Sequence, residues 1–133
     1  MLKAGGLESL IGIGAFAISC NAVAHHSGAM FDDKSSVTVA GTVKAFQWTN
    51  PHCWIQVLVP GEPSPIEWSI EMGSPSQLFR RGWRPGSLKA GDKIVAIIRP
   101  MRDGTHGGLF MSARRENGQP ISSNVELPSA GSP

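Results

Sequence analysis

The stretch SVTVAGTVKAFQW, residues 36–48, decides the fold class because it alternates in the manner of a long strand. Val37, Val39 and Val43 share one face with Gly41, and mostly threonines lie between them. This period of two predicts a strand with one buried face. A glycine in mid-strand indicates a bulge or a sharp bend. A long, bent first strand is typical of a sheet that curls into a small barrel.

The same alternation continues along the chain. It predicts four further strands, over residues 52–59, 66–70, 93–99 and 109–115. Trp68 falls on the inward face of its strand, and the last strand is expected to turn Leu109, Met111 and Ala113 inward. A short final strand is predicted near Ile121.

A short helix is predicted near residues 75–81, between the third and fourth strands. Ser74 is a good N-cap, Pro75 suits the first helical position and Gly82 suits the position after the end. These signals are closely spaced, so the helix is expected to have fewer than two turns.

The order of three strands, a helix and two strands is that of an oligonucleotide/oligosaccharide-binding (OB) barrel. We therefore predict an all-β fold, a small five-stranded OB-like barrel with one short helix between strands three and four. Leu78 and Phe79 of the helix are expected to cover one end of the barrel. A small β-sandwich of the same strands is the competing architecture.

The N-terminal segment has the pattern of an export signal. Lys3 precedes an apolar run over residues 10–18, and Ala22-Val23-Ala24 forms an A-x-A cleavage site. The apolar run is too short to span a bilayer, so we expect cleavage after Ala24 and no membrane span. An uncleaved anchor and lipid attachment at Cys20 are the alternatives.

Cleavage after Ala24 would divide the chain into segments and determine where the mature protein is located. Residues 1–24 would be the signal peptide, residues 25–121 one barrel domain with an N-terminal arm, and residues 122–133 a disordered tail rich in Ser, Pro and Gly. The mature protein is expected in the periplasm or secreted. It would retain one cysteine, Cys53, and hence have no internal disulfide.

The charge of the chain bears on its partners. A net charge of +2 is too mild to argue for nucleic acid, which is therefore not expected as a partner. We expect a monomer that takes a metal ion, a small ligand or a partner protein.

The histidines are the main candidates for chemistry. The chain has four, at His25, His26, His52 and His106. After cleavage His25 would carry a free α-amine beside its imidazole, an arrangement that resembles the histidine brace of copper proteins. Amine and imidazole nitrogens suit copper best among the common divalent metals. The third nitrogen would come from one of the other three histidines, and zinc is less favoured because H-x-x-x-H spacing is absent.

Other residues suggest weaker sites. Trp48 and Trp54 form a possible ligand face with Glu71, as aromatic side chains do in barrels that bind sugars or bases. The alternatives for Glu71 are support of a metal ligand and direct service as an extra ligand. Cys53 follows His52 directly, but neighbouring strand residues point to opposite faces, so Cys53 is expected to be a small buried hydrophobe rather than a nucleophile.

Several short motifs occur together in the mature chain. They are His25-His26-Ser27, Trp48-Thr49-Asn50-Pro51-His52, Trp68-Ser69-Ile70-Glu71, Arg81-Gly82-Trp83 and Arg102-Asp103-Gly104. This set resembles a family of small exported bacterial proteins of unknown function, over nearly the whole mature chain. The resemblance implies export and a compact β fold, and it transfers no catalytic role.

These observations favour a binding module over an enzyme. The leading hypothesis is an exported β-barrel protein that binds copper through its N-terminal histidines and acts as a carrier, sensor or accessory protein. One alternative is a metal-free interaction module for a peptide, a sugar or a partner protein. A copper oxygenase with a histidine brace is the third and least favoured.

Overall fold

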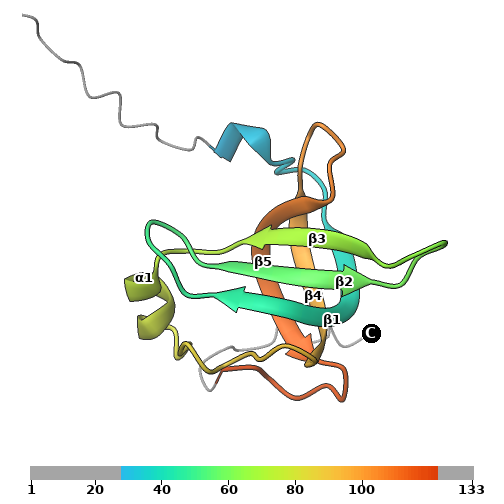
Figure 1. The fold of residues 1–133 in the computed structure, drawn as a ribbon. Coiled ribbons are helices and arrows are strands. Elements are labelled where there is room, and N and C mark those ends of the chain that lie inside the picture. Colours follow the sequence, from blue (N-terminus) through green and yellow to red (C-terminus); the bar gives the residue numbers. More distant parts are fainter. Residues whose placement is uncertain (1–27, 123–133) are drawn as a thin grey trace, which may run out of the picture.

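Five strands close into a barrel in the computed structural model, which describes residues 28–122 (Figure 1). The strands are β1 (Val37–Gln47), β2 (Trp54–Val59), β3 (Ile66–Glu71), β4 (Lys93–Pro100) and β5 (Gly107–Arg115). A 3-10 helix, η1 (Gly28–Met30), precedes them, and one α-helix, α1 (Pro75–Arg80), lies between β3 and β4. The predicted all-β, OB-like barrel with its single short helix is confirmed.

The strands follow the order β1-β2-β3-β5-β4 around the barrel, and β4 pairs with β1 to close it. Four of the five seams are antiparallel. The seam between β3 and β5 is parallel and short, with Ser69, Ile70 and Glu71 opposite Gly107, Gly108 and Leu109. In Figure 1, β4 and β5 cross behind β1, β2 and β3, while α1 lies at one end of the barrel.

The helix begins and ends where its sequence signals predict. The Ser74 hydroxyl accepts a hydrogen bond from the Gln77 amide at 3.3 Å, and the Gln77 side chain accepts one from the Ser74 amide at 3.0 Å. This capping box satisfies two amides that the first helical turn leaves without partners. Gly82 follows the C-terminal end with a φ of +86°, which a glycine adopts without strain.

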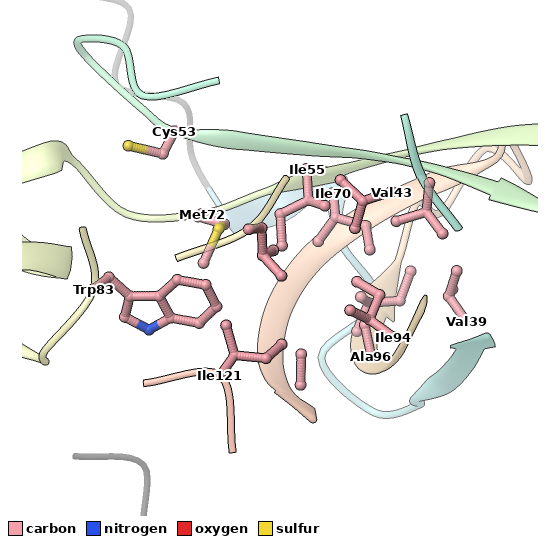
Figure 2. Close-up of a cluster of buried hydrophobic side chains, with 14 of the residues drawn as sticks. Val39, Val43, Cys53, Ile55, Ile70, Met72, Trp83, Ile94, Ala96 and Ile121 are labelled. Carbon is pink, nitrogen blue, oxygen red and sulfur yellow. The ribbon is translucent and has the colours of Figure 1, made fainter. Parts of the chain in front are cut away.

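The interior of the barrel is filled by apolar side chains from every strand (Figure 2). Ile94, Ala96 and Ile98 of β4 are buried together, as the alternation predicts. Trp83 lies near Met72 and Ile121 at the end of the barrel that α1 covers, and all three side chains are buried. These side chains fill the interior of the barrel, so a binding site has to lie on its outer surface or rim.

Phe79 differs from the prediction that it would cover the barrel end with Leu78. Leu78 is buried, but Phe79 is 54% exposed and lies under the guanidinium of Arg84, 3.8 Å from the ring centroid. A helix of fewer than two turns presents only a narrow face to the barrel, and Leu78 occupies that face.

Two β-bulges shift the faces of the strands that contain them. In β1 the register skips Lys44, between the pairs of Val43 and Ala45. In β5 it skips Met111, so Phe110 packs against the core and Met111 is 49% exposed. The prediction that Met111 points inward is therefore wrong, because the extra residue of a bulge reverses the alternation.

Strand boundaries also differ, most of all at the starts of β2 and β5. Strand β2 begins at Trp54 rather than His52, and β5 begins at Gly107 rather than Leu109. The final strand expected near Ile121 is a single bridge between Arg114 and Pro120. The predicted signal peptide and most of the predicted tail lie outside the described residues. Among residues 28–122, no helix has the length and apolarity that crossing a membrane requires.

Candidate functional site

A pocket of about 230 Å³ lies on the outer side of the short parallel seam. Ser69 and Glu71 face it because they alternate with Ile70, whose side chain is in the core. The other lining residues come from β2, from the start of β5, from the β4–β5 loop and from the N-terminal arm: Trp54, Gly107, Gly108, Met101, Thr105, His106, Met30 and Phe31. Four segments that are distant in the sequence therefore meet here.

The N-terminal arm forms one wall of the pocket and is fixed by backbone contacts. Phe31 is buried and makes an antiparallel bridge with Met101. The Arg102 amide donates to the Met30 carbonyl at 2.9 Å, and the Asp32 amide donates to the Pro100 carbonyl at 2.8 Å. Figure 1 shows η1 beside the β4–β5 loop as a result. These contacts hold Met30 at the rim of the pocket.

Two glycines allow the strands to approach beneath the pocket. A Cβ on Gly107 would lie 2.8 Å from the Ser69 carbonyl oxygen, and one on Gly108 would overlap the Arg99 carbonyl oxygen. The Ser69 amide donates to the His106 carbonyl at 3.1 Å, which is part of the same close approach. The last strand was expected to begin at Leu109, but both glycines are buried members of β5.

His106 is held at the edge of the pocket by an aromatic contact. Its ring centroid lies 5.1 Å from that of Trp68, with the two planes inclined at 45°. Trp68 is half-buried and packs against the core on its inward face. The exposed imidazole is therefore supported by the barrel, although it belongs to a loop.

Glu71 supplies the buried charge of the site. Its side chain lines the pocket, the residue is 6% exposed, and its Oε1 atom is paired with Nδ1 of His52. A buried carboxylate is stabilised by such a partner, because its charge would otherwise lose the stabilisation of water. Carboxylate–imidazole pairs of this kind orient histidines at metal sites. His52 thus lies behind the pocket wall that carries Glu71.

The remaining candidate residues lie elsewhere. Trp48 makes an edge contact with Phe46, with ring centroids 5.8 Å apart, and packs against the core rather than lining the pocket with Trp54. Cys53 is fully buried, and desolvation raises the pKa of its thiol. A protonated, enclosed thiol is a weak nucleophile, in agreement with its prediction as a small buried hydrophobe.

The histidine pair at His25 and His26 lies outside the described residues. Within residues 28–122, no group of three His, Cys, Asp or Glu side chains is placed to hold a metal ion. A site that includes His106 or His52 would therefore need donors from the N-terminal segment or from other residue types.

Sequence reasoning singled out His106, Trp54 and Glu71, which meet at the pocket, but it missed the methionines. Neither Met30, in the predicted N-terminal arm, nor Met101 was assigned a role at a site. Their donor atoms become significant only through the bridge between Phe31 and Met101, which joins residues far apart in the sequence.

Solved structures with a similar barrel include two crystal forms of the mitochondrial single-stranded DNA-binding protein Rim1 from S. cerevisiae. One has a TM-score of 0.47 at 7% identity and covers 62% of this chain and 93% of that chain. The other has a TM-score of 0.46 at 8% identity, with coverage of 62% and 92%. These values describe a likeness of fold alone.

The expectation that nucleic acid is not a partner is contradicted, since both similar structures are of a single-stranded DNA-binding protein. Mild net charge was too weak a ground for that exclusion, since OB barrels also hold single strands by stacking bases on aromatic side chains.

Two sequence comparisons bear on identity. No curated protein matches the chain. Residues 14–112 match a family of unknown function, DUF6152, which agrees with the resemblance of the motifs to a family without an assigned activity. That match spans most of the described barrel, and the chain therefore belongs to this family of unknown function.

Proposed function

We propose that the chain is an exported copper-binding module. In this proposal His25 binds copper through its α-amine and its imidazole after cleavage behind Ala24. A histidine at the pocket supplies a further nitrogen. The protein would then act as a carrier, sensor or accessory protein in the periplasm or outside the cell.

The observation that carries the proposal is the anchoring of the arm beside His106. The described chain starts at Gly28, two residues after His26, and Met30 already lines the pocket. Two residues of chain span at most about 7 Å, so covalent geometry alone gives His26 a short reach from Gly28. The histidine pair therefore directly precedes, in the sequence, the arm that is anchored at the pocket lined by His106.

Two imidazoles on the barrel are candidates for the further nitrogen. His106 is exposed and lines the pocket directly. His52 is not among the residues that line the pocket, and it is connected to the pocket through its pairing with Glu71. The direct position favours His106 as the ligand, with Glu71 contributing negative charge close to a bound cation.

The deciding experiment compares two forms of the protein. One is the protein recovered after export, with its N-terminus at His25 verified by intact mass, and the other carries one additional residue before His25. The mature form should bind one Cu(II) ion about tenfold or more tightly than the extended form, because an acylated amine cannot coordinate in the same way. Equal affinities would contradict the brace.

A pair of variants identifies the further nitrogen. His106→Phe removes the ring nitrogens but keeps an aromatic ring against Trp68, and His52→Ala serves as the comparison. Weaker Cu(II) binding by His106→Phe alone would support the assignment. Weaker binding by His52→Ala alone would move the ligand to the other imidazole.

A second candidate is a metal-free module that binds a small apolar ligand or a peptide. The apolar side chains of the lining favour it, since Met30, Phe31, Trp54 and Met101 are four of the ten residues around the pocket. Metal analysis of protein recovered after export separates the copper-binding module from this candidate, because this candidate requires no bound metal. Oxygen consumption in the presence of copper and a reductant would separate a copper oxygenase from a carrier.

A further inference from the structure

We propose that Met30, Met101 and His106 form a site for Cu(I) in the pocket beside the parallel seam. This deepens the proposed function, on which it rests for the choice of copper as the metal. It uses a different donor set, two thioethers and one imidazole, and it concerns the reduced ion rather than Cu(II).

The three residues line one pocket because the backbone holds their segments together. Met30 and Met101 belong to the two segments joined by the bridge of Phe31, and both line the pocket. The Met101 amide donates to the Gly107 carbonyl at 3.1 Å, which places Met101 opposite the residue that follows His106. A Cβ on Gly107 would lie 3.6 Å from Cγ of Met101, so the methionine side chain lies directly over this glycine.

The donor chemistry selects the reduced ion. Thioether sulfur is a soft, uncharged ligand that favours Cu(I), whereas Cu(II) prefers nitrogen and oxygen. The surrounding wall suits a monovalent cation as well. Glu71 contributes one buried carboxylate, and Trp54 adds to the lining an indole, a ring system that attracts cations.

The ordinary role of methionine in proteins is to fill gaps in the core, as Met72 does here with its side chain fully enclosed. Met30 does not fit this role, since it is 38% exposed at the pocket rim, and Met101 is only half-buried. Met111 is similarly exposed, but it lies on the β5 bulge and does not line the pocket. Met111 therefore provides a matched control for a thioether that should not bind the ion.

The main experiment measures Cu(I) affinity by competition with a chromophoric Cu(I) chelator under anaerobic conditions. It uses protein obtained by expressing the full chain, with Met30→Leu/Met101→Leu as the test variant and Met111→Leu as the control. Leucine conserves volume and apolarity, so both variants should fold, which circular dichroism verifies. The test variant should lose about tenfold or more in Cu(I) affinity, and the control should stay within about twofold.

A second measurement does not depend on affinity. Ag(I) replaces Cu(I) as a redox-inert probe, and the ¹³C-labelled methionine methyl resonances are followed by NMR. Those of Met30 and Met101 should shift on addition of Ag(I), and those of Met72 and Met111 should not. Unchanged resonances of Met30 and Met101, or a test variant that binds Cu(I) as tightly as the unmodified protein, would overturn the assignment.

The two copper proposals fail in different ways. The form with one additional residue before His25 should keep its Cu(I) affinity, because the thioether site does not use the α-amine. If the mature and extended forms bind Cu(II) equally tightly while Cu(I) affinity depends on Met30 and Met101, the brace is wrong and this site stands. If Cu(II) binding needs the α-amine and the methionines make no difference, the brace stands and this site is wrong.

Discussion

Replacing Trp83 with alanine should remove the largest fully buried side chain of the described barrel. Trp83 is 1% exposed. Its ring lies 5.6 Å from that of Phe110 in an edge contact and 5.9 Å from that of Phe46 in a tilted one. The Trp83 amide also donates to the Leu78 carbonyl at 3.0 Å, which fixes the ring just after α1. The substitution would therefore open a cavity between the helix and the barrel.

The size of the effect follows from the area that the ring buries. A tryptophan side chain buries about 150–250 Å², which at about 25 cal/mol per Å² corresponds to roughly 4–6 kcal/mol. A compact denatured state has already buried part of this area, which lowers the figure to roughly 3–5 kcal/mol. Measured tryptophan-to-alanine changes in cores are also about 3–5 kcal/mol. A domain of this size has a total stability of about 5–15 kcal/mol, so the variant should be marginal.

Urea denaturation followed by far-UV circular dichroism measures the change without relying on the fluorescence of the residue removed. Trp54→Ala is the matched control, since Trp54 is half-buried on the outer side of β2 and its loss leaves the core intact. The control should lose clearly less stability than Trp83→Ala. A loss below about 1 kcal/mol for Trp83→Ala would refute the reasoning, because it would mean that the ring is not enclosed as the structure describes.

Three further predictions concern packing, pH and reactivity. Gly108→Ala should lower the free energy of unfolding by about 1–3 kcal/mol, because its Cβ would overlap the backbone carbonyl oxygen of Arg99, which cannot move aside as the end of a side chain can. Gly86→Ala, with open space around it, should change the free energy of unfolding by less than about 1 kcal/mol in the same urea assay. Hydrogen bonds, the largest from the Lys89 amide, hold the pKa of the Asp92 carboxyl below its ordinary value. The stability they contribute is fully present above the unfolded-state pKa of about 3.9 and is lost as pH falls through the lower folded-state pKa. The deficit of Asp92→Asn at pH 7 should therefore shrink progressively in thermal melts below about pH 3.9. Cys53 should resist a maleimide in native buffer and react in denaturant, and rapid native labelling would show that its enclosure is incomplete.

The barrel was predictable because its strands follow period-two alternation and its helix carries strong end signals. Ser74, Pro75 and Gly82 mark the helix through local chemistry that needs no tertiary context. One error falls where a single residue interrupts that local order. Met111 was assigned to the wrong face because a bulge depends on the neighbouring strand, and the sequence of one strand does not record it.

The candidate site was predictable only residue by residue. His106 and Glu71 stood out because ionisable side chains are conspicuous in a β-rich sequence, but nothing in their spacing showed that one pocket contains both. Their separation in the sequence is bridged by the parallel pairing of β3 with β5. Such non-local pairing arises from the closure of the barrel, which single-sequence patterns do not encode.

The parallel seam explains why a site forms at this place on the barrel. Parallel pairing joins strands distant in the sequence, and here the pairs of Ser69, Ile70 and Glu71 are the whole of the seam. The pocket lies directly over it, and the arm and the β4–β5 loop complete the wall where the paired strands end. Loops and arms accept new side chains at low cost to the fold, whereas the core beneath them constrains every substitution. Function at this barrel should therefore be sought in the loop and the arm, where Met30, Met101 and His106 lie.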